Sequence, residues 1–169
     1  MKIGLISDTH GFLDDRVFHH FETCDEVWHA GDIGEGGVLE ALQNFKPTQA
    51  VYGNIDGPEM QRELPEYIAT SIEGLKILMI HICGTPGKYA RRAKELIAEH
   101  SPDLLICGHS HILKVMPDKQ NQLFYMNPGA AGRHGFHQVR TLLRFDIAQG
   151  RAQNLEVIEL GKRSEIKKP

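Results

Sequence analysis

The sequence predicts an α/β fold in which strands and helices alternate along the first two-thirds of the chain and strands dominate the last third. Up to Cys107, short apolar runs alternate with amphipathic stretches, which is typical of strand–helix units. Glycine-rich segments separate these elements and mark the turns between them. After Ile112 the helical pattern gives way to short apolar segments that are bounded by turn residues.

The strands expected in the first part are short apolar runs. They are Lys2–Ser7, Glu26–His29, Gln49–Tyr52, Tyr67–Ile72, Leu75–Ile80 and Asp103–Cys107. Glu73 and Gly74 are expected to form a hairpin turn. Three amphipathic segments predict helices, the first of them capped by Asp14 or Asp15. These segments are Asp14–Glu22, Gly37–Phe45 and Gly87–His100.

The last third predicts antiparallel strands joined by short turns. The strands are Ile112–Met116, Leu123–Met126, Val139–Asp146 and Asn154–Glu159, with turns at Pro117–Asn121 and Gln149-Gly150. Neither a repeat nor a linker interrupts the pattern, so residues 1–160 are expected to form a single domain. Residues 161–169 carry four basic side chains and are expected to form a flexible, solvated tail.

Composition excludes several classes of protein. Apolar residues make up 41% of the 169 residues and charged residues 24%, which is ordinary for a globular protein and argues against disorder. The net charge of −3 disfavours a polymer of nucleic acid as partner. Apolar runs are too short to span a membrane. Three scattered cysteines, with Cys107 expected to be buried and inert, argue against a disulfide framework and favour a reducing, cytoplasmic location.

Five of the apolar runs end in side chains that can bind metal ions. These side chains are Asp8 and His10, then Asp32, Asn54 and His81, and finally His109 and His111. Ligands of open α/β sheets bind outside the carboxyl ends of the strands, so these residues are expected to converge on one patch.

The donor set of this patch indicates transition-metal ions. Two carboxylates, one amide and four imidazoles suit manganese, iron, zinc, nickel or cobalt. Seven donors are too many for one structural zinc ion, which takes about four. They fit two ions that share a bridging carboxylate. In Asp8-Thr9-His10 and His109-Ser110-His111 the donors are two residues apart, so in an extended segment both point to the same side.

These motifs resemble the calcineurin-like metallophosphoesterase superfamily. The family pattern is Asp-x-His, Gly-Asp, Gly-Asn-His-Asp/Glu, a single His and Gly-His-x-His. Here it stands as Asp8-Thr9-His10, Gly31-Asp32, Gly53-Asn54-Ile55-Asp56, His81 and Gly108-His109-Ser110-His111. The short length and the Asn127-Pro128-Gly129 loop are similar to the small YfcE-type phosphodiesterases of bacteria and archaea.

The resemblance implies a four-layer αββα sandwich of two mainly mixed sheets, and a dinuclear metal site. Asp8, His10, Asp32 and His111 would bind one ion, and Asp32, Asn54, His81 and His109 the other, with Asp32 bridging them. The catalytic residues would be Asp8, His10, Asp32, Asn54 and His81. Two divalent ions are implied, most often Mn²⁺, with Ni²⁺, Fe²⁺ or Zn²⁺ as alternatives. Small members of the family form dimers or tetramers.

Two positions depart from the family pattern. Ile55 replaces a histidine that in many members protonates the leaving group or contacts phosphate, although the small subgroup often lacks it. This disfavours substrates with alkoxide leaving groups. In the family a glycine commonly follows the single histidine, and here Ile82 stands at that position. This difference affects the expected path of the loop and not the expected role of His81.

The function expected from these residues is hydrolysis of a small phosphodiester by a metal-bridging hydroxide. Alternatives are a phosphomonoesterase, a nuclease, and a non-catalytic scaffold similar to the metallophosphoesterase-like subunit of retromer. Asp56 is expected to be a turn residue or to support the site without binding metal. Arg133, His134 and His137 follow the Asn127-Pro128-Gly129 loop, and their role stays open between surface residues and contacts to the metals or the substrate phosphate.

Overall fold

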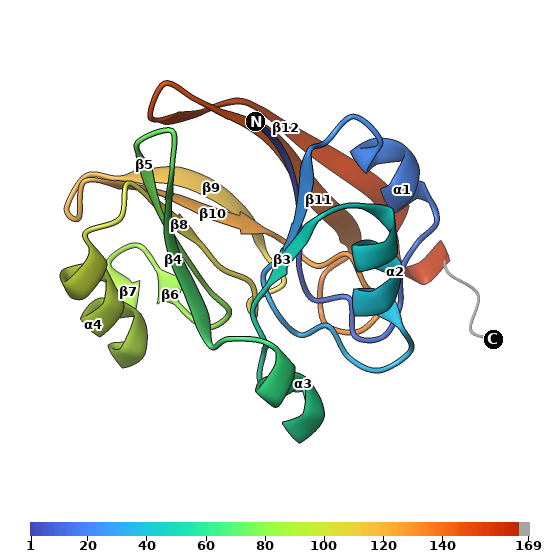
Figure 1. Ribbon diagram of the computed structural model, residues 1–169. Coiled ribbons are helices and arrows are strands. Elements are labelled where there is room, and N and C mark those ends of the chain that lie inside the picture. Colours follow the sequence, from blue (N-terminus) through green and yellow to red (C-terminus); the bar gives the residue numbers. More distant parts are fainter. Residues whose placement is uncertain (166–169) are drawn as a thin grey trace.

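The computed structural model describes residues 1–165, in which two five-stranded sheets pack face to face (Figure 1). The first sheet has the order β12-β11-β1-β2-β3 and consists of β1 (Lys2–Ile6), β2 (Glu26–His29), β3 (Thr48–Ala50), β11 (Val139–Ala148) and β12 (Arg151–Lys162). The second has the order β4-β5-β8-β10-β9 and consists of β4 (Tyr67–Ile72), β5 (Leu75–Ile80), β8 (Leu104–Ile106), β9 (Leu113–Asp118) and β10 (Leu123–Pro128).

Both sheets are mixed. β1, β2 and β3 are parallel, whereas β11 and β12 continue the same sheet in antiparallel pairing, with Ile3 opposite Phe145. In the second sheet β8 lies parallel to both β5 and β10, and the edge strands β4 and β9 are antiparallel to their neighbours. The C-terminal strands therefore complete both sheets of a single sandwich.

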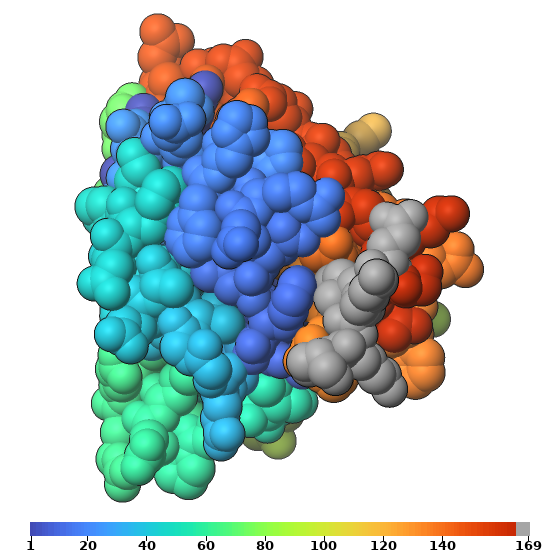
Figure 2. All heavy atoms as spheres, turned by 90° about the vertical axis from the view of Figure 1, so that its right-hand side faces the viewer, coloured from blue at the N-terminus to red at the C-terminus, as the bar shows by residue number. Residues whose placement is uncertain are grey.

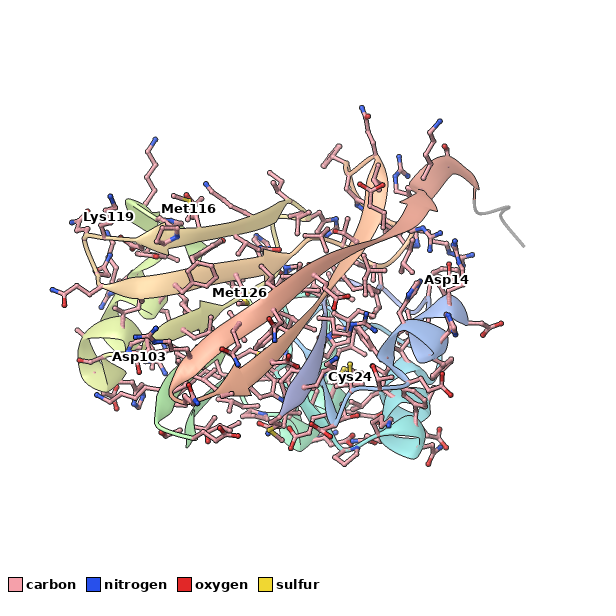
Figure 3. The ribbon with its side chains drawn as sticks, turned by 90° about the horizontal axis from the view of Figure 1, so that it is seen from above. Asp14, Cys24, Asp103, Met116, Lys119 and Met126 are labelled. Carbon is pink, nitrogen blue, oxygen red and sulfur yellow. A yellow bond between two sulfur atoms is a disulfide. The ribbon has the colours of Figure 1, made fainter. Side chains whose placement is uncertain are left out.

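Three apolar clusters show the layers of the sandwich. The cluster between the sheets joins Ile3 and Trp28 of the first sheet to Ile106 and Met126 of the second, and Figure 3 labels Met126 at this place. A second cluster lies between the first sheet and its helices, and a third between the second sheet and the last helix. The sandwich thus has the four αββα layers that the sequence motifs predict.

The helices cover the outer faces of the two sheets. They are α1 (Arg16–Phe21), α2 (Val38–Phe45), α3 (Pro58–Glu63) and α4 (Arg91–His100). Helices α1 and α2 pack on the first sheet, and α4 packs on the second. The blue and cyan atoms of α1 and α2 form much of the face in Figure 2. None of the helices among residues 1–165 is long and apolar enough to cross a membrane.

Several element boundaries differ from the sequence prediction. Helix α4 begins at Arg91 instead of Gly87, because β7 (Lys88–Tyr89) pairs with β6 (Gly84–Thr85) in a small ribbon. Helix α3 is an element that the sequence pattern did not indicate. Strand β12 continues to Lys162, and a 3₁₀ helix follows at Arg163–Glu165. The rest of the predicted tail, 166–169, lies outside the described residues.

The cysteines differ from the sequence expectation. Cys83 and Cys107 form a disulfide, so the expectation that Cys107 is inert is wrong, whereas its expected burial is confirmed. The scattered positions of the three cysteines hid this pairing, because β5 and β8 are neighbours in the sheet and bring the ends of two distant segments together. Cys24 is free and buried under α1, and burial raises the pKa of its thiol to about 11.

An ion-pair network at the start of α1 joins the beginning and the end of the chain. Asp14, labelled in Figure 3, accepts hydrogen bonds from the Arg16 side chain and from Nη1 of the buried Arg140, both at 2.7 Å to Oδ2. Both arginines also donate to the carbonyl oxygen of Leu160. The hydrogen bonds from Arg16 first, and those from Arg140, lower the pKa of Asp14 well below its usual range.

We expect Asp14→Ala to lower the free energy of unfolding by about 2 kcal/mol at neutral pH, because the variant leaves the buried Arg140 without its carboxylate partner. This value lies between those typical of exposed and of buried ion pairs. The folded state lowers the pKa of Asp14. The stabilisation that the Asp14 carboxylate gives to the fold is therefore complete above the unfolded-state pKa of about 3.9 and is lost as the pH falls further. Urea unfolding of the wild type and the variant at pH 7 and pH 3 measures this. The matched control is Asp15→Ala, because Asp15 is exposed and makes no side-chain cap. Equal stability of the two variants at pH 7 would contradict the prediction.

Candidate metal centre

Four loops, each directly after a strand, bring six of the predicted ligands together. They follow β1, β2, β5 and β8, and they carry Asp8 and His10, Asp32, His81, and His109 and His111. The side chains form two groups that could each hold a metal ion. One group is Asp8, His10, Asp32 and His111, and the other is Asp32, His81 and His109. Within each group the ligand atoms lie within 4.8 Å of one another, and Asp32 belongs to both.

The first group surrounds a small space with nitrogen and oxygen atoms. Nε2 of His111 lies 3.3 Å from Nε2 of His10 and 3.3 Å from Oδ1 of Asp8. Nε2 of His10 lies 3.6 Å from Oδ2 of Asp32. Burial, as the largest cause, lowers the pKa of His10 and favours the neutral imidazole, which is the form that binds metal.

The second group contains a buried nitrogen atom without a hydrogen-bond partner. Nδ1 of His81 lies 2.7 Å from the carbonyl oxygen of Ala30, which can only accept, so Nδ1 carries a proton and the neutral imidazole presents its lone pair at Nε2. That Nε2 atom is buried, makes no hydrogen bond, and lies 3.1 Å from Oδ1 of Asp32. Two electron-rich atoms this close need a positive charge between them. Burial alone would lower the pKa of His81, but Asp32 outweighs it and raises that pKa, so without metal a proton on Nε2 supplies this charge. A metal ion would take the place of that proton, so the residues fit the ion that the motifs imply.

Asp32 is placed to serve both groups. Its Oδ2 atom faces His10 and its Oδ1 atom faces His81. Burial by itself would raise the pKa of Asp32, but His81 and the backbone N–H of Ile55, which donates to Oδ1 at 3.1 Å, outweigh it and lower the pKa. The carboxylate is therefore ionised at neutral pH and has an oxygen atom available to each group.

The other predicted ligands are more open to solvent. His109 is exposed, its ring lies 5.3 Å from the ring of His81, and its backbone N–H donates to the Asp8 carboxylate at 3.2 Å. Asn54 is exposed and lines a cavity together with His81. The structure thus places Asn54 beside the second group, and its role as a ligand stays a proposal.

The backbone of the site is strained. Five of the predicted ligands have φ angles in the left-handed region, which non-glycine residues seldom adopt. They are Asp8 (54°), His10 (48°), Asp32 (54°), His109 (67°) and His111 (57°). Such strain costs about 1–3 kcal/mol per residue and clusters at functional sites, because only the surrounding structure can maintain it. The expectation of extended segments at Asp8-Thr9-His10 and His109-Ser110-His111 is therefore wrong for these four ligands. Aspartate and histidine are enriched at positive φ, but too weakly to predict it at a given position.

Asp56 supports the site without facing either metal group. Its buried carboxylate accepts backbone hydrogen bonds from Gly53 at 2.7 Å, Gly34 at 2.8 Å and Ile33 at 3.2 Å. It therefore fastens the loop after β3 to the loop that carries Asp32. This is the supporting role that the sequence analysis expected for Asp56.

We expect Asp56→Asn to weaken manganese binding about 10- to 100-fold, as removal of a residue that orients metal ligands usually does. The amide has one acceptor oxygen and cannot receive all three backbone N–H groups. Isothermal titration calorimetry with Mn²⁺ measures the change. Asp103→Asn is the matched control, because Asp103 also accepts a backbone N–H, from Lys76 at 2.9 Å, but precedes β8 and lies away from its carboxyl end. Equal affinities of both variants would contradict the expected role.

Two further polar residues, Asn127 and His29, position the ligand loops, and no local sequence pattern predicts these contacts. Nδ2 of the buried Asn127 donates to the carbonyl oxygen of Gly108 at 2.7 Å and so fixes the start of the His109–His111 loop. His29 is fully buried, accepts the backbone N–H of Gly31 at Nδ1 and bonds Thr9 through Nε2. Burial lowers the pKa of His29 to about 4, so it is neutral at pH 7.

Of the three residues singled out after the Asn127-Pro128-Gly129 loop, His134 and His137 lie near the site. The His137 ring lies 5.4 Å from that of His111, and its Nε2 atom donates to the carbonyl oxygen of Gly132. The His134 ring lies 6.0 Å from that of His10, and both line an open hollow of about 610 Å³ that also includes Ile55. The guanidinium of Arg133 instead lies 5.3 Å above the Phe12 ring.

Two ion sites that share a carboxylate are typical of metal-dependent enzymes that cleave phosphate esters. The chain belongs to the calcineurin-like phosphoesterase superfamily, whose domain model matches residues 1–150. It is 32% identical over 136 residues to a probable metallophosphoesterase of Methanocaldococcus jannaschii, covering 77% of this chain and 68% of that protein. It is 26% identical over 146 residues to a phosphodiesterase of the same organism, covering 76% and 83%.

The fold is similar to that of a solved structure, a single mutant of Vps29 from Entamoeba histolytica. The TM-score is 0.73 at 18% sequence identity, and the match covers 95% of this chain and 100% of that chain. This likeness supports the fold alone. The family match confirms the resemblance that the sequence motifs indicate, and the chain is a member of a family of metal-dependent hydrolases.

Proposed function

We propose that this protein is a dinuclear metal-dependent phosphodiesterase that acts on a small phosphodiester. The observation that carries the proposal is the position of Asp32, whose two carboxylate oxygens face two different groups of metal ligands. A site for one ion would not need a second group of ligand side chains around the other carboxylate oxygen of Asp32. Membership in a phosphoesterase superfamily and the similarity to a phosphodiesterase support the choice of reaction.

In this proposal Asp8, His10, Asp32 and His111 bind one ion, and Asp32, Asn54, His81 and His109 bind the other. The donors are nitrogen and oxygen atoms without thiolate, which suits Mn²⁺, with Ni²⁺, Fe²⁺ or Zn²⁺ as alternatives. When bound, the ions would supply Lewis acidity, which lowers the pKa of water towards about 7 and neutralises charge on the phosphoryl oxygens. The protein's part is to orient the ligands: Ala30 fixes the tautomer of His81, and the N–H of Ile55 orients Asp32.

The residues at the mouth of the site favour substrates with good leaving groups. The side chain of Ile55 is 44% exposed in the hollow beside His10 and can neither donate a proton nor bind phosphate. An ester whose leaving group departs as a stabilised anion does not need a proton donor there. The net charge of −3 disfavours a long nucleic acid, so a small diester is the proposed substrate.

The test is to remove metal from the purified protein, restore Mn²⁺, Ni²⁺, Fe²⁺ or Zn²⁺ singly, and follow hydrolysis of bis-p-nitrophenyl phosphate and p-nitrophenyl phosphate. Metal-dependent cleavage of the diester in preference to the monoester is the expected result. Preference for the monoester would replace the phosphodiesterase with a phosphomonoesterase at the same site. No turnover with any of the four metals would favour a non-catalytic scaffold on this fold.

A further inference from the structure

A second hollow adjoins the metal centre on the side of His81. It is a cavity of about 330 Å³ between the segment that follows β3 and the start of α4. His81 and Asn54 form part of its wall, so a molecule bound by the second metal group would extend into it. The hollow beside His10, by contrast, is wide and open.

The wall of the cavity is mostly apolar. Tyr52, Ile80, Ile82 and Ala90 contribute to it from three segments of the chain. Ile82 follows His81 directly and is 39% exposed, although it is a large aliphatic side chain. Burying such a side chain against a ligand is favourable, because it removes apolar surface from water. The cavity is thus suited to an apolar group that is attached to the phosphate.

The acidic and basic side chains of the cavity wall, Glu66 and Arg92, form an ion pair without net charge. Arg92 Nη2 lies 2.8 Å from Oε2 of Glu66, and the guanidinium lies 5.4 Å from the Tyr67 ring centroid. Gln61 donates through Nε2 to the carbonyl oxygen of Asp56 at 2.7 Å, which fixes its amide. A second phosphate would have to compete with Glu66 for Arg92. A neutral group that donates and accepts hydrogen bonds would not have to displace Glu66 from Arg92.

We propose that this cavity binds one organic substituent of the phosphoester, a planar uncharged ring such as an aryl ester or a nucleoside carries. The volume lies at the lower end of the range for small-molecule sites, about 300–1,000 Å³, which suits one ring and excludes a folded polymer. The inference rests on the proposed function, because the metal centre would hold the phosphate while the cavity holds the ring. Ile82 would then be a specificity residue for the ring.

The first test compares two exposed isoleucines that each follow a candidate ligand. Ile82 lines the cavity, whereas Ile55 lines the hollow beside His10. Inhibition of diester hydrolysis is measured with phenyl phosphate, thymidine 5′-phosphate and methyl phosphate. Ile82→Ala is expected to weaken inhibition by a ring-bearing phosphate about tenfold, which is typical for lost methylene contacts, and to leave methyl phosphate unchanged. Phenyl phosphate and thymidine 5′-phosphate separate an aryl from a nucleoside preference.

Three outcomes would overturn the inference: no change for either ring-bearing phosphate, an equal loss for methyl phosphate, or a larger effect of Ile55→Ala. A second measurement does not depend on activity. Phenyl phosphate is titrated into the protein loaded with Zn²⁺, which is diamagnetic and provides the ions that would hold the phosphate, and backbone amide shifts are followed by NMR. Shifts centred on Gln61, Ile82 and Ala90 support the cavity, and shifts centred on Gly36 and His134 contradict it. If the wild type hydrolyses no diester, the proposed function fails, and this titration still decides where the ring binds.

Discussion

Replacing Asp32 with asparagine is expected to reduce metal-dependent phosphodiesterase activity by about three orders of magnitude. Asp32 is the one residue shared by both ligand groups, and its two oxygens face His10 and His81. Asparagine keeps the size of the side chain but offers one neutral oxygen, so it cannot serve both groups with negative charge. Metal ions contribute several kcal/mol to such reactions, and about 1.4 kcal/mol corresponds to a tenfold change in rate.

The measurement is kcat/KM for bis-p-nitrophenyl phosphate at saturating Mn²⁺, together with the stoichiometry of bound metal. Asp15→Asn is the matched control, since Asp15 is an exposed carboxylate at the start of α1 and should leave the rate unchanged. Thermal unfolding shows whether Asp32→Asn folds. A folded variant that retains more than about a tenth of the activity would remove Asp32 from the centre of the mechanism.

The second large effect is expected for Gly53→Ala. A methyl group at Gly53 would overlap Oδ1 and the backbone nitrogen of Asp32, so the loop after β3 or the loop of Asp32 must move. A misplacement of about 1 Å at a catalytic centre costs about 100-fold in rate, and we expect a loss of that size. This glycine is required for close approach of the two loops.

Gly57→Ala provides the control for this prediction. Gly57 lies four residues further along the same loop, has a φ of −70°, and a methyl group there would meet nothing within 4 Å. We expect its activity to match that of the wild type. Both variants are assayed for diester hydrolysis and for urea unfolding. If Gly53→Ala retains full activity and full metal affinity, the geometry described for Asp32 is wrong.

The sequence predicted well those elements whose signal is local. Strands Glu26–His29, Tyr67–Ile72 and Leu75–Ile80 have the predicted bounds, because β-branched and apolar side chains end abruptly at polar or glycine residues. Helix α3 was missed because it has only six residues, of which four are polar and none is fully buried, so no apolar periodicity marks it. The start of α4 was placed too early because Lys88 and Tyr89 pair with Gly84 and Thr85 in a short ribbon, which the apolar periodicity of the helix does not reveal.

The candidate site was predictable in composition but less so in detail. The motifs located the ligands at the ends of strands, and six of the seven converge as expected. The left-handed conformation of these residues depends on contacts between loops and has no local signal. The same holds for the pairing of Cys83 with Cys107 and for the carbonyl oxygen of Ala30, which fixes His81. Interactions between distant segments therefore determine what the motifs alone leave undefined.

The central claim is that Asp32 bridges two metal ions, and anomalous diffraction from crystals grown with Mn²⁺ tests it most directly. We expect two peaks, one among Asp8, His10, Asp32 and His111, and one among Asp32, Asn54, His81 and His109. Each carboxylate oxygen of Asp32 should contact a different peak. A single peak, or two peaks of which only one contacts Asp32, would contradict the account.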